Sequence, residues 1–157
     1  MTPVRVIGIG SPHGADQAGW LVADALQHSE LPARLPAGTV SFSQCLFPAQ
    51  LWQLVDGCDL AILIDAVCAE PGTVVEVDSG DLTNRKALHS THGIGVGEAL
   101  ALIPALTDRP PRVVLIGVGV DAENGGGAME DMKRTLPRVR ELMEAPLREF
   151  LQTATGT

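Results

Sequence analysis

The sequence contains no tyrosine, and aromatic residues account for only 3% of its 157 residues. Its apolar content of 45% is therefore supplied mainly by valine, leucine, isoleucine and alanine. These residues are typical of a parallel sheet that helices cover on both faces. The charged fraction of 19% is that of a globular protein rather than a disordered one.

Four further absences limit the classes of protein to which the chain can belong. No apolar run reaches the ~20 residues of a membrane-spanning helix, so we expect no membrane insertion. The net charge of −8 and the lack of clustered basic residues argue against a nucleic-acid partner. No signal-like segment opens the chain. Cys45, Cys58 and Cys68 form no CxxC pair, which favours free thiols in a reducing compartment. We expect a cytoplasmic monomer.

Strand-like and helix-like segments alternate along the chain. Apolar, β-branched runs predict strands at 4–10, 39–42, 60–67 and 112–118, with a short extended segment at 72–77. Helical spacing predicts helices at 16–26, 48–57, 92–103 and 129–151, and we expect prolines 137 and 146 to kink or segment the last. The polar stretch 78–90 is expected to be a loop. This alternation predicts a three-layer α/β/α fold with a mostly parallel twisted sheet, in one domain over 1–157.

The first strand ends in Gly8-x-Gly10, which invites a comparison with dinucleotide-binding loops. His13 stands where the third glycine of that fingerprint belongs, and no acid ends the second predicted strand. No Gly-Lys-Ser or Gly-Lys-Thr sequence is present either. A tight strand-to-helix turn explains these glycines better than phosphate binding does.

Three polar side chains follow predicted strands or open predicted helices. Asp16 begins the first helix, Asp65 ends the central strand, and His92 begins the third helix. The carboxyl ends of parallel strands meet at one edge of a sheet, where ligands gather. Two carboxylates and an imidazole suit a divalent cation such as nickel or zinc, and they leave coordination positions open for substrate or water.

Each of the three side chains also has a structural interpretation. Asp16 alone is best explained as an acid in the first turn of a helix, where the helix dipole favours negative charge. His92 alone is best explained as a helix-capping residue. Asp65 is harder to dismiss, because an uncompensated carboxylate in an apolar strand is costly, although it could cap a neighbouring helix.

Other groups are weaker candidates. His13 is a less favoured ligand, and His28 and His89 are expected at the surface. No G-x-S-x-G elbow supports a serine nucleophile. Cys68, three residues after Asp65, is close enough to act as a thiol nucleophile, but a free cysteine is more often a small buried apolar residue, which is the interpretation we prefer.

Three segments together resemble the hydrogenase maturation proteases. The first is Val6–Gly10 with His13-Gly14-Ala15-Asp16-Gln17-Ala18-Gly19, which is similar to the family's strand, glycine turn and acidic motif. The second is Leu63–Val67, similar to its strand ending in Asp-Ala, and the third is Ser90–Gly93, similar to its Ser-x-His motif. Two positions differ from the family's usual residues: Ala15 replaces the first acid of a doublet, and Ser11 replaces asparagine.

The resemblance implies an aspartic-type, metal-dependent endopeptidase that removes a C-terminal extension from the large-subunit precursor of a nickel–iron hydrogenase. It implies that Asp16, Asp65 and His92 are both the catalytic and the metal-recognising residues. It also implies that the nickel arrives in the precursor rather than as a resident cofactor. Two alternatives stay open: a non-catalytic metal- or partner-binding module with the same fold, favoured by Ala15, and a nucleotide-binding α/β protein.

Overall fold

A computed structural model of the chain describes residues 2–78, 95–121 and 127–156. Within them, no helix is both long enough and apolar enough to cross a membrane. The elements in chain order are β1 Val4–Ile9, η1 Gly14–Gln17, α1 Ala18–Gln27, η2 Pro32–Arg34, β2 Val40–Cys45, η3 Pro48–Gln50, α2 Leu51–Val55, β3 Leu60–Cys68, β4 Val74–Asp78, α3 Gly95–Leu106, β5 Arg112–Val120 and α4 Ala128–Thr155, where η marks a 3₁₀ turn.

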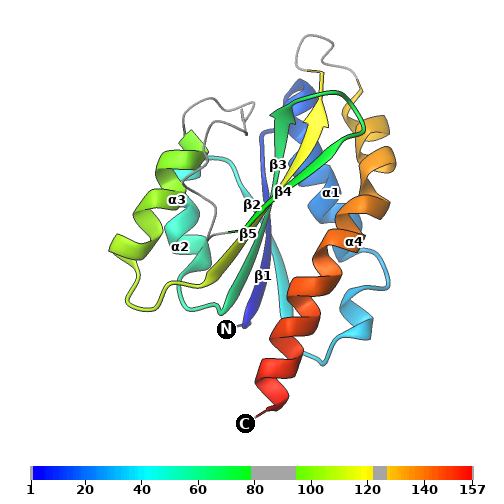
Figure 1. Cartoon of the computed structure of the whole chain (residues 1–157). Helices are drawn as coiled ribbons and strands as arrows, with labels where there is room; N and C mark the ends of the chain where they lie inside the picture. The colour runs from blue at the N-terminus through cyan, green and yellow to red at the C-terminus, as the bar shows by residue number, and fades with distance from the viewer. Residues whose placement is uncertain (1, 79–94, 122–126, 157) are drawn as a thin grey trace.

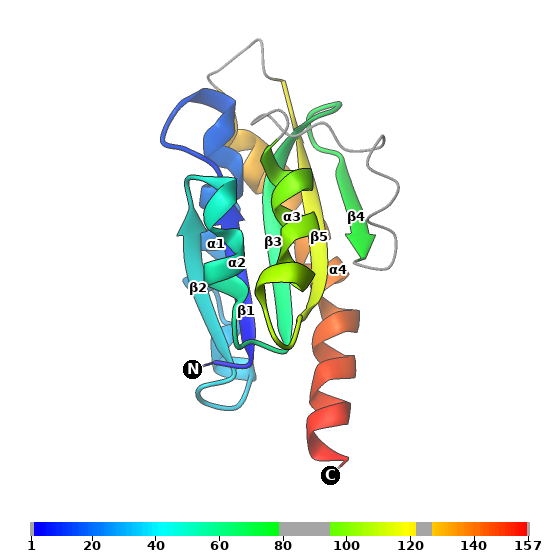
Figure 2. The same cartoon turned by 90° about the vertical axis from the view of Figure 1, so that its left-hand side faces the viewer.

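The strands form one sheet in the order β2-β1-β3-β5-β4. All neighbours are parallel except β4, which runs antiparallel to β5 at one edge. Helices α1 and α4 cover one face, and α2 and α3 cover the other (Figures 1 and 2). The predicted three-layer α/β/α fold with a mostly parallel sheet is confirmed.

Successive side chains of β3 belong alternately to two parts of the core, one on each face of the sheet. Leu60, Ile62 and Ile64 pack with α1 and α4, whereas Ala61 and Leu63 pack with α2 and α3. Successive side chains of a strand point to opposite faces, so a fully buried strand is apolar at every position. This explains why the segment was recognisable in the sequence.

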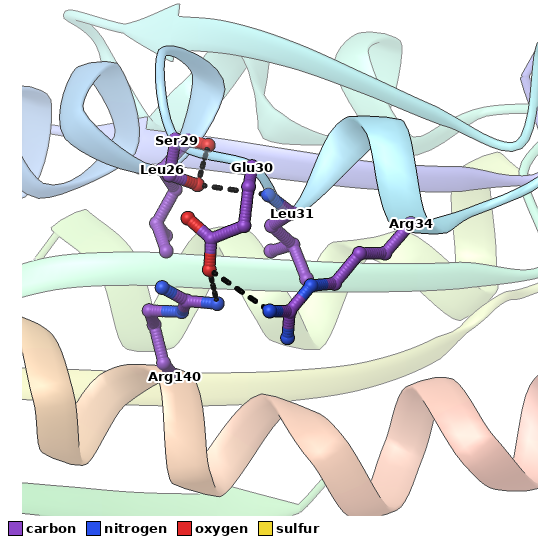
Figure 3. A network of polar contacts seen from close by, with 6 residues as sticks. All are labelled: Leu26, Ser29, Glu30, Leu31, Arg34 and Arg140. Atoms are coloured by element: carbon purple, nitrogen blue, oxygen red, sulfur yellow. Dashed lines mark hydrogen bonds and ion pairs between the residues drawn. The ribbon is translucent and has the colours of Figure 1, made fainter.

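The polar contacts that join the connection after α1 to α4 lie at the opposite edge of the sheet from the carboxyl ends of the parallel strands. Glu30 contacts both Arg34 and Arg140, and its Oε1 lies 3.9 Å from Arg34 Nη2 (Figure 3). The hydrogen bond from Arg140 is the main cause that holds the pKa of Glu30 below its usual value. Because Glu30 and Arg34 are exposed and Arg140 is only partly buried, the contacts add little to stability.

Several local predictions need correction. Asp16 lies in the 3₁₀ turn η1 rather than in an α-helix, because the chain folds back over the end of β1 and the Ser11 amide donates to the Asp16 carbonyl at 3.4 Å. Pro137 and Pro146 do not segment α4, which continues through both over 28 residues. The predicted loop at 78–90 lies outside the described residues, apart from Asp78 in β4.

The first helix approaches the sheet through a pair of glycines. A Cβ atom on Gly19 would lie 2.2 Å from the Ile9 carbonyl oxygen and 2.7 Å from that of Ile64. A Cβ on Gly8 would lie 2.6 Å from the Gly19 carbonyl oxygen. The glycines therefore allow close packing of helix on strand, which agrees with the tight strand-to-helix turn predicted from the sequence.

We predict that Gly19→Ala lowers the free energy of unfolding by about 3 kcal/mol or more, because backbone atoms of two strands cannot move away from the added methyl group. Gly127→Ala is the matched control, since its Cβ would meet no atom nearer than Asp131 Oδ2 at 3.7 Å. The control should change stability by only about 0.5 kcal/mol. Urea denaturation midpoints at constant slope measure both. Equal effects would contradict the packing argument.

Candidate functional site

The carboxyl edge of the parallel strands holds the candidate site. Asp65 lies in β3 opposite Ile9, the last residue of β1, and opposite Gly117 of β5. It is only 1% exposed. Because Ala61 and Leu63 pack with α2 and α3, the strand alternation directs the Asp65 carboxylate to that same side of the sheet.

Asp16 reaches this edge on a different segment. It lies in η1, which comes directly after the turn that follows β1 and contacts β3. The Gly19 contact with Ile64 anchors the start of α1 against β3, one residue before Asp65. The structure therefore brings the segments that carry Asp16 and Asp65 together at one edge.

The third predicted ligand, His92, lies outside the described residues, as do His89 and the Ser90–Gly93 motif. The described chain resumes at Gly95, where α3 begins. Among residues 2–78, 95–121 and 127–156, no three histidine, cysteine, aspartate or glutamate side chains are grouped so as to hold a metal ion. His13 and His28 are both exposed, which confirms the predicted surface position of His28.

Cys45 is a site neighbour that the sequence did not reveal as such. It ends β2 opposite Ile9 and is 1% exposed. Its thiol donates a hydrogen bond to the Phe47 carbonyl at 3.1 Å. Burial, and secondarily the negative charge of Asp65, raise the pKa of this thiol to about 11.

Trp20 connects the first helix to the ends of β1 and β2. Its Nε1 donates to the Cys45 carbonyl at 3.3 Å, and the Gly10 amide donates to the same oxygen at 3.0 Å. The end of β1, the end of β2 and the first helix are thus joined at one carbonyl. A tryptophan at helical spacing carried no signal of this contact, since its partner lies 25 residues away.

Cys68 is exposed, not buried as predicted. Beyond Asp65, β3 continues past the end of β1, so Cys68 pairs only with Val120 of β5. Cys45 and Cys58 are buried. The prediction that all three cysteines are free is confirmed.

One further carboxylate that the sequence did not single out lies at the start of α4. Asp131 is 8% exposed, and burial is the main cause that raises its pKa. Asp121 and Glu130 raise it further, whereas Arg134 lowers it.

Two surface cavities lie away from this edge, on either side of the C-terminal half of α4. The first, about 460 Å³, is bordered by Leu31, Arg34 and Arg140. The second, about 620 Å³, lies beneath the opposite edge of the sheet, next to Pro3, Asp59 and Arg112. Three ion pairs involve residues that line them: Arg140–Glu30, Arg109–Asp59 and Arg112–Glu149. Neither cavity includes Asp16 or Asp65.

Comparison with known proteins decides the family. The family described as hydrogenase maturation protease matches residues 36–145, which is more than half of the chain. The chain belongs to the hydrogenase maturation protease family. The matched range includes Asp65 and His92, whereas Asp16 precedes it. Membership makes the chain a C-terminal processing endopeptidase. No curated protein matches the sequence.

Solved structures share the fold at low sequence identity. An endopeptidase from Escherichia coli is 19% identical over 88% of this chain and 90% of its own, with a TM-score of 0.65. The NiFe hydrogenase maturation protease HybD from Thermococcus kodakarensis is 18% identical over 90% and 99%, with a TM-score of 0.61. The protease HycI from the same organism is 24% identical over 91% and 93%, with a TM-score of 0.55. At these sequence identities, the three likenesses show that the chain shares its fold with these proteins.

The pKa values of the buried thiols generate a pH prediction. Burial raises the pKa of both the Cys45 and the Cys58 thiol from an ordinary value of 9.0 to about 11. Unfolded thiols therefore ionise first, so stability is retained below pH 9.0 and decreases as the pH rises from 9.0 to about 11. Urea denaturation at pH 8, 9 and 10.5 measures the decrease in the free energy of unfolding. Its slope with pH should correspond to the release of about one or two protons on unfolding.

The matched variants for this prediction are Cys58→Ala and Cys68→Ala, compared with the unsubstituted chain. The first should reduce the alkaline loss of stability, and the second should leave it unchanged because Cys68 is exposed. Alkylation at pH 8 should modify Cys68 in the native protein and all three thiols after unfolding. Rapid alkylation of Cys45 in the native state would contradict its burial.

Proposed function

We propose that this protease cuts the C-terminal extension from a nickel–iron hydrogenase large-subunit precursor only after nickel is in place, and that Asp16, Asp65 and His92 recognise that nickel. The observation that carries the proposal is the buried carboxylate of Asp65 at the end of the central strand, beside the segment that bears Asp16. Family membership supports the reaction.

The chemistry of the donor set supports a metal that belongs to the substrate. Two carboxylates and one imidazole are hard-to-borderline ligands that suit nickel, and they form an incomplete coordination shell. A closed structural zinc site would use four ligands, commonly thiolates. With these three side chains as partial ligands, the remaining positions are filled by groups of the precursor. Correct metal loading then positions the extension for hydrolysis, and the same side chains act as the catalytic residues.

The non-catalytic alternative rested on Ala15, which replaces an acid that is usual in the family. Ala15 is 9% exposed and packs in the core between α1 and α4. An acid there would have to lie in apolar surroundings, or else the turn would have to shift. The replacement therefore removes no side chain from the surface on which Asp16 lies. This favours a catalytic protein over the binding module.

The place of action follows from the same chemistry. We place the protein in the cytoplasm, where free cysteines stay reduced, and assign it a folded hydrogenase precursor as its partner. The exposed Cys68 is compatible with that compartment. The protein is proposed to act as a monomer and to insert in no membrane.

We predict that Asp65→Asn abolishes processing and leaves the fold intact. Asparagine keeps the shape of the side chain but loses the charge that attracts a cation, so the rate should fall by about 100-fold or more. Conversion of nickel-loaded precursor to its shorter form, followed by gel mobility and mass spectrometry, measures the rate. Circular dichroism measures the fold. Loss of folding would identify Asp65 as a structural residue.

Asp56→Asn is the matched control for that variant. Asp56 is exposed and follows α2, at the opposite edge of the sheet from Asp65. The same charge is removed there without altering the carboxyl edge, so processing should stay within about twofold of the unsubstituted rate. A comparable loss in both variants would show that net charge, rather than the site, controls the reaction.

We also predict that the purified protease contains little bound nickel or zinc and that nickel-free precursor remains uncut at high enzyme concentration. An incomplete shell binds a cation weakly until the precursor completes it. Elemental analysis of the protein measures its metal content. Addition of nickel to the precursor, not to the protease alone, should start cleavage. Efficient cleavage of metal-free precursor would exclude nickel recognition but not the family.

A further inference from the structure

Three exposed apolar side chains lie at the edge of the sheet that carries Asp65. Five large apolar residues are exposed in the part of the chain that the structure describes. Leu46 at 41% and Phe47 at 59% directly follow β2, and Met129 at 49% lies in the first turn of α4. All three lie at the carboxyl edge of the parallel strands, whereas Leu102 and Leu106 lie on α3.

The backbone around Phe47 is held in place although its ring is exposed. Its carbonyl oxygen accepts hydrogen bonds from the Cys45 thiol at 3.1 Å and from the Gln50 amide at 2.9 Å. Pro48 then begins η3. The Cys45 carbonyl is in turn bonded to Gly10 and Trp20. An aromatic side chain on such a fixed turn loses little conformational freedom when it binds a partner.

Phe47 lies close to the candidate site through Cys45. The last residue of β1, Ile9, is opposite both Cys45 and Asp65, so the two residues flank the same position of the sheet. The Cys45 thiol in turn donates a hydrogen bond to the Phe47 carbonyl at 3.1 Å. A ligand bound at Asp65 would therefore have the Leu46–Phe47 turn beside it.

The charge pattern indicates what kind of partner this turn fits. No aspartate, glutamate, lysine or arginine occurs between residues 35 and 55, although the chain has 19 acidic and 11 basic residues. Depletion of charge together with an exposed aromatic ring is the composition found at the centre of protein interfaces. A partner segment that meets this turn is expected to be uncharged and apolar.

We propose that Phe47, with Leu46 beside it, anchors an apolar side chain of the precursor next to the bond that is cut. The inference rests on the proposed function and specifies its substrate: the residues that flank the scissile bond include an apolar one that packs on the Phe47 ring. Phe47 acts as a specificity-determining residue. It contributes binding area and touches none of the atoms that react.

The decisive comparison is between Phe47→Ala and Leu106→Ala. Leu106 is 47% exposed and ends α3 at the opposite edge of the sheet, so it offers a similar apolar surface away from Asp65. With nickel-loaded precursor, Phe47→Ala should raise KM about tenfold or more and change kcat by less than about twofold. Leu106→Ala should change neither. Phe47→Leu should recover most of the lost affinity, because it restores an apolar side chain.

Equal kinetic constants for Phe47→Ala and Leu106→Ala would overturn the inference while the proposed function stands. If the unsubstituted protein cuts no precursor, the proposed function fails. The inference is then tested by calorimetry, which measures the affinity of the precursor for both variants. A weaker affinity for Phe47→Ala alone supports it, and equal affinities overturn it. A Phe47-dependent dimer in sedimentation experiments would assign the turn to a second copy of the chain and overturn the proposal.

Discussion

The close contact between the first helix and the ends of two strands is the constraint on which the site depends. Gly19 presses against the carbonyls of Ile9 and Ile64, and no residue with a Cβ atom fits there without backbone movement. This contact sets where η1 lies and therefore where Asp16 reaches the edge of the sheet. It also brings Trp20 within hydrogen-bonding distance of Cys45, so one packing contact positions several parts of the site.

The buried carboxylate of Asp65 is the second organising feature. Its strand is otherwise apolar from Leu60 to Val67, and burying an ionised group costs several kcal/mol unless its surroundings compensate it. The neighbouring strands β1 and β5 hold β3 in a fixed register, so the carboxylate cannot easily rotate out to water. A rigid sheet that tolerates this group is typical of a functional site that departs from what stability alone favours.

The two edges of the sheet differ in chemistry. At the edge where the parallel strands begin, ion pairs connect Glu30 with Arg34 and Arg140 (Figure 3). Arg112 pairs there with Glu149 of α4. At the edge where the parallel strands end, the surface offers Asp16, the apolar Leu46–Phe47 turn and the exposed Cys68. Ion pairs between exposed groups contribute little to stability but keep that part of the surface polar. The carboxyl edge thus combines a candidate acid with exposed apolar side chains.

Much of the fold follows from local patterns in the sequence. The apolar runs that became β1, β3 and β5 and the helical spacing of α1 and α4 depend on neighbours a few residues apart, which a sequence displays directly. Asp16 and Asp65 were recognisable because each is a charge at the boundary of an apolar element. The sequence also carried the family motif at His92, whose placement lies outside the described residues.

Other features depend on contacts between distant segments, and these were decided only by the tertiary structure. The order β2-β1-β3-β5-β4 places Cys45 and Asp65 on either side of Ile9, although 20 residues separate them in the chain. The exposure of Cys68 follows from β3 extending past β1, and the continuity of α4 through two prolines depends on its packing against the sheet and α1. Periodicity reports which face of an element is apolar, but not which element covers that face, so it cannot show that Trp20 and Phe47 are both hydrogen-bonded to Cys45, beside the candidate site.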